Sequence, residues 1–94
     1  MSISVPDFMN LSNVNIIDLR SVEKFNNSHI PGSINIPAEK ILLRPFDYIN
    51  NDSKYYLYCQ HGISSLNVCR ILSRLGFNVV SINGGYEEWL LMNK

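Results

Sequence analysis

Short apolar runs alternate with helix-like patterns along this chain. The apolar runs are typical of buried strands. They cover residues 14–19, 33–36, 55–58 and 79–82. The segments between and after them have the spacing expected of helices. These cover residues 21–27, 38–49 with a break at Pro45, 64–75 and 86–91.

Capping and turn residues support these boundaries. Ser21 stands where a helix N-cap is expected, and Gly76 stands where the helix at residues 64–75 should stop. The Pro31-Gly32 pair predicts a turn before the short strand. Residues 84 and 85 are both glycine, which predicts a turn that needs positive φ angles.

Strands alternating with helices predict an α/β fold with three layers, α/β/α. We expect a mostly parallel central sheet of four to five strands, covered on both faces, and one domain over residues 1–94. In such sheets ligands bind beyond the carboxyl ends of the strands. Asp18 and Cys59 both stand at predicted strand ends. The pattern therefore predicts a site at that edge.

Composition narrows the function classes. The chain has 94 residues, 46% of them hydrophobic, and a net charge of zero, so nothing favours nucleic acid or an anionic membrane as a partner. No apolar run approaches the ~20 residues that span a bilayer, and the N-terminus lacks the pattern of a secretory signal. Two cysteines make neither a disulfide framework nor a zinc site. We expect a cytoplasmic protein with reduced thiols.

The candidate chemistry lies in the loop that follows the strand at residues 55–58. The loop reads Cys59, Gln60, His61, Gly62, Ile63, Ser64, Ser65. If it curls around the sulfur, successive backbone N–H groups converge there and form an anion-binding nest at a helix N-terminus. Gly62 permits the required backbone angle, and Ser64 and Ser65 can cap the helix or turn their hydroxyls inward. Backbone groups alone can then stabilise a thiolate or persulfide.

Each candidate residue also has a structural interpretation. Cys59 is either a nucleophile or a buried thiol that ends a strand, whereas Cys69, on the apolar side of a helix, is interpreted as a core residue. His61 either contacts a bound anion or is an exposed loop residue. For His29 a structural hydrogen bond is favoured. Arg20 either faces the substrate or forms a bracing pair with Asp18, and bracing is favoured.

Three segments together resemble the rhodanese-like (sulfurtransferase) family. They are IIDLRSVEKFNNSHIPGSINIP, CQHGISS and INGGYEEWL. The first is similar to the family's Asp-x-Arg strand end, helix and His-Ile-Pro-Gly segment, and the last to its Gly-Gly-x-x-x-Trp ending, with Trp89 in place. Their order and spacing over almost the whole chain make the resemblance specific.

The resemblance implies a thiosulfate sulfurtransferase. Cys59 would take a sulfane sulfur from thiosulfate or a similar donor, hold it as a persulfide, and pass it to a thiol or to cyanide. The amides of Gln60, His61, Gly62, Ile63 and Ser64 would form the cradle, and Ser65 and Arg20 would also bind substrate. No metal or organic cofactor is implied.

One departure from the family concerns the donor's charge. Many members carry arginine at the fifth position after the cysteine, where this chain has Ser64. The resemblance therefore leaves His61, Arg20 or Arg44 to meet the charge of an anionic donor.

Two alternatives stay open. The domain is either an enzyme for small donors or a persulfide relay between a cysteine desulfurase and a protein acceptor, in the extreme a binding module. A cysteine-dependent phosphatase is the weaker alternative, because its Cys-x5-Arg loop needs arginine where this chain has Ser65.

Overall fold

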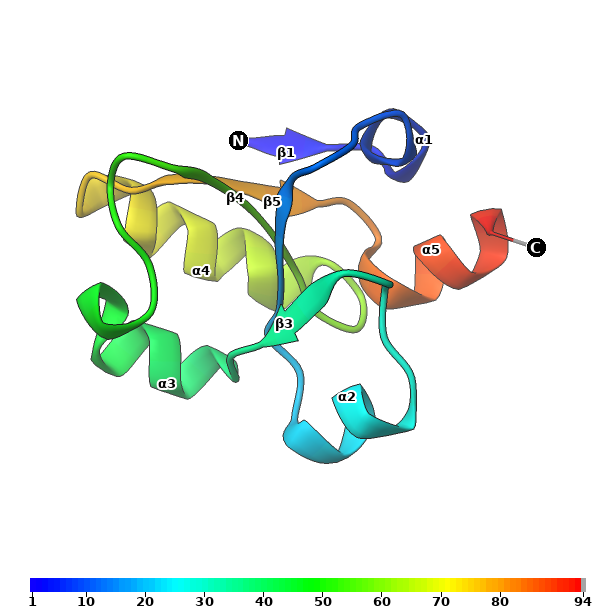
Figure 1. Cartoon of the computed structure of the whole chain (residues 1–94), viewed down its shortest axis with the longest axis horizontal. Helices are drawn as coiled ribbons and strands as arrows, with labels where there is room; N and C mark the ends of the chain where they lie inside the picture. Colours follow the sequence, from blue (N-terminus) through cyan, green and yellow to red (C-terminus); the bar gives the residue numbers. More distant parts are fainter. Residues whose placement is uncertain (94) are drawn as a thin grey trace.

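Within residues 1–93, which the computed structural model describes, five strands form one sheet in the order β1-β5-β4-β2-β3 (Figure 1). The strands are β1 (Ser2–Ile3), β2 (Asn15–Asp18), β3 (Ser33–Asn35), β4 (Lys54–Tyr58) and β5 (Asn78–Ile82). All neighbouring pairs are parallel, so the carboxyl ends of the strands meet at one edge. β4 lies in the centre.

Helices connect and cover the strands. They are α1 (Val5–Met9), α2 (Val22–Asn27), α3 (Ala38–Leu43), the 3-10 helix η1 (Pro45–Asp47), α4 (Ile63–Arg74) and α5 (Gly85–Met92). The Ser21 hydroxyl accepts a hydrogen bond from the backbone N–H of Lys24 and caps α2, as expected. Pro45 ends the helical run of α3, since proline cannot continue a helix. No helix in the described chain has the length and apolar character to cross a membrane.

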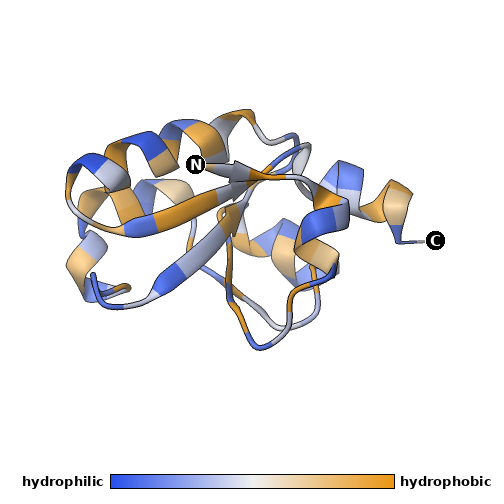
Figure 2. Cartoon of the chain, turned by 90° about the horizontal axis from the view of Figure 1, so that it is seen from above, coloured by the Kyte–Doolittle hydropathy of each residue, from blue (hydrophilic) through white to orange (hydrophobic). Residues whose placement is uncertain are grey.

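The sheet has a hydrophobic cluster on each face, because side chains alternate along every strand. On β4, Leu57 packs among residues of α3 and α4, whereas Tyr56 and Tyr58 pack among residues of α1 and α5. In Figure 2 the strands carry long hydrophobic stretches, and the helices alternate between hydrophobic and hydrophilic positions. The predicted three-layer α/β/α architecture is therefore confirmed.

The predicted strands and helices are present with boundaries shifted by a few residues, and two elements were not predicted. β1 and α1 precede the first predicted strand. β1 pairs with β5, so it completes the sheet as an edge strand. α4 begins at Ile63, one residue earlier than expected, with Gly62 as its N-cap at a φ of 94°.

The residues of the predicted site lie at the carboxyl edge of the sheet. Asp18, the last residue of β2, lies beside Tyr58, the last residue of β4. Cys59 follows Tyr58 directly, and the Gly84-Gly85 turn follows β5 with φ angles of 77° and 62°. The turn therefore has the positive φ angles that its sequence predicted, and it lies against the cysteine loop.

Candidate active site

Two backbone N–H groups and one hydroxyl surround the sulfur of Cys59. The backbone N–H groups of Gly62 and Ser65 point at Sγ, at 3.1 and 3.2 Å, and the Ser65 hydroxyl lies 3.4 Å from it. The side chain is nearly buried, at 8% exposure. Backbone N–H groups directed at one atom stabilise negative charge there, so this geometry suits a thiolate.

The structure changes the membership of the predicted cradle. Among residues 1–93, the amides that bond to the sulfur are those of Gly62 and Ser65. The loop sequence alone predicted that the amides from Gln60 to Ser65 could converge on the sulfur, and the resemblance implied those of residues 60–64. The Ser65 N–H reaches the sulfur from the first turn of α4, which begins at Ile63.

Helix α5 fixes the cysteine loop through backbone hydrogen bonds. The N–H groups of Tyr86 and Glu87 donate to the carbonyl oxygens of Cys59 and Gln60, at 2.9 and 3.1 Å. A Cβ atom at Gly85 would collide with the Cys59 carbonyl oxygen, so only glycine allows this close approach. The carbonyl groups of Cys59 and Gln60 thus face α5, whereas the N–H groups of Gly62 and Ser65 face the sulfur.

Ser65 connects the sulfur to the sheet. Its side chain is fully buried, and its hydroxyl contacts the Ser81 hydroxyl on β5 at 2.8 Å and the Gly62 carbonyl oxygen at 3.3 Å. The hydroxyl therefore lies between the sulfur and two polar groups of the scaffold. Ser64, in contrast, is exposed.

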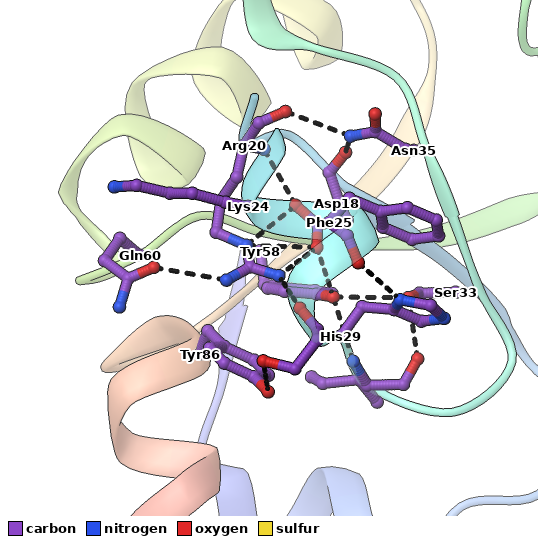
Figure 3. A network of polar contacts seen from close by, with 12 residues as sticks. Asp18, Arg20, Lys24, Phe25, His29, Ser33, Asn35, Tyr58, Gln60 and Tyr86 are labelled. Carbon is purple, nitrogen blue, oxygen red and sulfur yellow. Dashed lines mark hydrogen bonds and ion pairs between the residues drawn. The ribbon is translucent and has the colours of Figure 1, made fainter. Parts of the chain in front are cut away.

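A buried ion pair lies beside the loop (Figure 3). Both carboxylate oxygens of Asp18 bind Arg20, with an Nη2–Oδ2 distance of 2.7 Å, and the Tyr58 hydroxyl donates to Oδ2 at 2.6 Å. Burial, then the hydrogen bond to Asp18, raises the pKa of Tyr58 well above its usual value, so the phenol stays protonated. The Tyr58 hydroxyl also accepts from the Ile30 N–H.

Arg20 links this pair to the cysteine loop. Its Nη1 donates to the Gln60 side-chain oxygen at 3.3 Å, and Nη2 donates to the Ser28 carbonyl oxygen at 2.6 Å. The guanidinium lies 4.1 Å from the centre of the Tyr86 ring. Burial opposes its charge, but Asp18 outweighs burial and raises the pKa of Arg20. The bracing interpretation matches this geometry, and Arg20 also lines the pocket next to Cys59.

Two pockets meet at this edge. One of about 260 Å³ contains Cys59, together with Leu19, Arg20, Ser21, Lys24, Ala38, Gln60 and Ser64. The second, of about 390 Å³, shares Arg20, Lys24 and Gln60 with it. The second pocket also includes Asn27, Ser28, His61, Tyr86 and Leu90. A further cavity of about 400 Å³, near Met9 and Trp89, has no cysteine, histidine or charged side chain among its lining residues.

The other candidate residues, His61, Ile63 and Arg44, make no hydrogen bond to the sulfur in the described chain. His61 is exposed, and its Nδ1 is 3.3 Å from a carboxylate oxygen of Glu87. The Ile63 side chain is 72% exposed to solvent. Arg44 pairs with Asp47 at 2.6 Å and does not line either pocket, which contradicts its expected part in meeting the donor's charge.

Cys69 and His29 have the structural surroundings that the sequence predicted for them. Cys69 is fully buried in the cluster between the sheet, α3 and α4, and burial raises the pKa of its thiol to about 12. His29 stacks on Phe25, and its Nδ1 lies 2.8 Å from the Phe25 carbonyl oxygen.

Sequence reasoning missed Lys24 and Tyr86. Lys24 reaches the pocket because α2 packs beside the cysteine loop, a tertiary contact that no local pattern indicates. Tyr86 had a usable signal, since it follows the glycine pair directly at the start of a predicted helix.

A parallel α/β sheet with a cysteine loop at its carboxyl edge defines the class of this protein. The chain matches the Rhodanese-like domain family over residues 4–92 and belongs to that family. It is 38% identical over 77 residues to the thiosulfate sulfurtransferase GlpE of Shewanella oneidensis, covering 81% of this chain and 75% of that protein.

Other relatives broaden the comparison. The putative sulfur carrier protein YrkF of Bacillus subtilis is 30% identical over 77 residues, covering 81% of this chain and 41% of that protein. A rhodanese-related protein of Thermoplasma volcanium superimposes with a TM-score of 0.86 at 32% identity, covering 97% of this chain and 91% of the other. Sulfurtransferases and sulfur carriers thus both occur among the relatives.

Proposed function

We propose that this protein is a sulfurtransferase that carries sulfane sulfur on Cys59, with thiosulfate or a similar anion as donor. The observation that carries the proposal is the pair of N–H groups, from Gly62 and Ser65, directed at a sulfur that lines an open pocket. Family membership and the resemblance to a thiosulfate sulfurtransferase support it.

The proposed reaction has two displacement steps. The Cys59 thiolate attacks the outer sulfur of thiosulfate, the S–S bond breaks, and sulfite leaves with the bonding electrons. An acceptor such as cyanide or a thiolate then attacks the outer persulfide sulfur. That S–S bond breaks and returns the electrons to Cys59, so the thiolate is regenerated. The amides of Gly62 and Ser65 stabilise the negative charge on Cys59 before and after transfer.

The remaining loop residues have supporting parts in the proposal. Gln60 and Ser64 line the pocket next to the sulfur, and Arg20 fixes Gln60 from the side. Ser65 donates its N–H to the sulfur, and its hydroxyl lies next to the sulfur. No metal or organic cofactor takes part, and the proposed setting is the cytoplasm, where thiols stay reduced.

Intact mass after thiosulfate, before and after cyanide, tests the proposal. We expect a gain of one sulfur that cyanide removes and that is absent in Cys59→Ser. A wild-type protein that gains no sulfur from thiosulfate would remove it as the donor.

A persulfide relay is the second candidate. The exposed apolar side chain of Ile63, next to the loop, supplies a contact for a protein acceptor or donor. A cysteine desulfurase with cysteine as its substrate would then load Cys59 where thiosulfate does not. A phosphatase activity is disfavoured, because Ser65 stands where the Cys-x5-Arg loop of such a phosphatase has its arginine. The Ser65 hydroxyl contacts the sulfur instead.

A further inference from the structure

The charge of an anionic donor is not met by the cations that the sequence suggested. Arg20 lies in a bidentate pair with Asp18, and His61 lies beside Glu87. Arg44 pairs with Asp47 away from both pockets. The first of these pairs is buried, so its carboxylate offsets the guanidinium charge at close range.

Lys24 is the cation that differs from these three. It lines the pocket that contains Cys59 and also the adjoining pocket. Within residues 1–93 no carboxylate lies within 4.0 Å of its ammonium group. Figure 3 shows its side chain extending past Arg20 on the side where Gln60 lies.

The position of Lys24 is set by the backbone of α2. Its N–H donates to the Ser21 hydroxyl, and its carbonyl oxygen accepts from the Ser28 N–H. Its main chain is therefore held while the side chain stays exposed and free to follow a ligand. A fixed backbone with an exposed ammonium group suits the binding of an anion in either of two adjoining pockets.

We propose that Lys24 is the residue that binds the anionic end of the sulfur donor and the departing anion. This inference rests on the proposed function and names a specificity-determining residue for it. As the donor's S–S bond breaks, negative charge grows on the leaving sulfite. Because Lys24 borders both pockets, its ammonium group can attract that charge in either of them.

Alkylation of Cys59 tests Lys24 without requiring sulfur transfer. Iodoacetate and iodoacetamide both react by attack of the thiolate on a methylene carbon with loss of iodide, and they differ in charge. The rate of each is measured by mass spectrometry of the Cys59 peptide, which separates it from Cys69. The informative quantity is the ratio of the iodoacetate rate to the iodoacetamide rate.

We expect Lys24→Gln to lower this ratio roughly three- to tenfold, as befits one partly screened charge that lines the same pocket as the thiol. Lys24→Arg should keep the ratio within about twofold, because it preserves the charge. Lys54→Gln is the matched control, since Lys54 lies at the opposite end of β4, and it should leave the ratio unchanged.

The same variants are then assayed with thiosulfate. Lys24→Gln should raise the KM for thiosulfate several-fold and reduce its dependence on ionic strength. An unchanged alkylation ratio in Lys24→Gln would overturn the inference, even if thiosulfate still loads Cys59. An equal fall of both alkylation rates would overturn it too, because Lys24 would then act on the thiol itself. A lowered ratio in a protein that takes no sulfur from thiosulfate would support the anion site and reject the proposed donor.

Discussion

Cys59 and Cys69 are both buried, with exposures of 8% and 0%, but one thiol has polar surroundings and the other has apolar surroundings. The sulfur of Cys59 meets two backbone N–H groups and a hydroxyl at the edge of a pocket. Cys69 lies in a hydrophobic cluster, where burial raises its pKa to about 12.

The difference shows that burial alone does not decide what a thiol does. Removing a sulfur from water disfavours its charged form, unless dipoles of the protein replace the lost water. At Cys59 the replacement comes from the main chain of a loop that α5 holds in place. Four experiments can break or sharpen this comparison.

The largest effect is expected from removing each thiol in turn. Cys59→Ala should lower sulfur transfer by at least about 1000-fold while the protein stays folded, because the nucleophile is lost. Cys69→Ala should keep most of the activity and lower the free energy of unfolding by about 1–3 kcal/mol, because it leaves a cavity. Transfer rates and urea unfolding curves measure the two effects. Two folded variants with equal loss of activity would reject the contrast.

The next effect comes from the close packing behind the cysteine loop. Gly85→Ala should slow transfer roughly ten- to hundredfold, because the new methyl group displaces the Cys59 carbonyl oxygen. Gly76→Ala is the matched control: its φ is also positive, at 97°, but a Cβ there has no atom within 4 Å. Both substitutions carry backbone strain of about 1–2 kcal/mol. Equal activity in the two variants would show that the contact with α5 does not position the sulfur.

A smaller effect is expected from the hydroxyl of Ser65. Ser65→Ala removes its contacts with the Cys59 sulfur and with Ser81, whereas Ser81→Ala removes the second contact alone. Both variants should lose about 1 kcal/mol of stability. Transfer should slow several-fold only in Ser65→Ala, as steady-state rates at saturating thiosulfate would show. A similar slowing in Ser81→Ala would assign the effect to the scaffold.

The smallest effect is a difference in alkaline stability. Burial raises the pKa of Cys69 above its unfolded value, so its contribution is complete below roughly pH 8.5 and declines as the pH rises toward 12. Wild type should therefore lose about 2 kcal/mol more than Cys69→Ala between pH 7 and pH 10. Urea unfolding at the two pH values measures this, and parallel losses would show that Cys69 ionises without penalty.

Much of the fold followed from the hydrophobic pattern, because four strands are long enough to show it. The two-residue strand β1 has no periodicity to detect. For α1 there was a signal in Ser4, Pro6 and Asp7, which occupy the N-cap and first turn, but five residues are too few for a helical period.

The candidate site was predictable where chemistry is local in sequence. Cys59, Gly62 and Ser65 lie within seven consecutive residues, so a nest of amides could be inferred from this segment alone. Which two of these amides reach the sulfur depends on the path of the backbone into α4, which the sequence does not specify. The place of Lys24 in the pocket depends on how α2 packs against a loop more than thirty residues away in the sequence. Arg44 pairs with Asp47 outside the pocket, which the sequence did not predict.

The contact between α5 and the cysteine loop also sets an order of events during synthesis. The carbonyl groups of Cys59 and Gln60 accept hydrogen bonds from the N–H groups of residues 86 and 87. Strand β1 pairs with β5, which is synthesised much later. A growing chain therefore contains the thiol before it contains what holds the loop. Parallel pairing between residues so distant in sequence is slow to form. The ability to hold sulfur therefore depends on residues that are synthesised after the thiol itself, because α5 must be present to hold the loop.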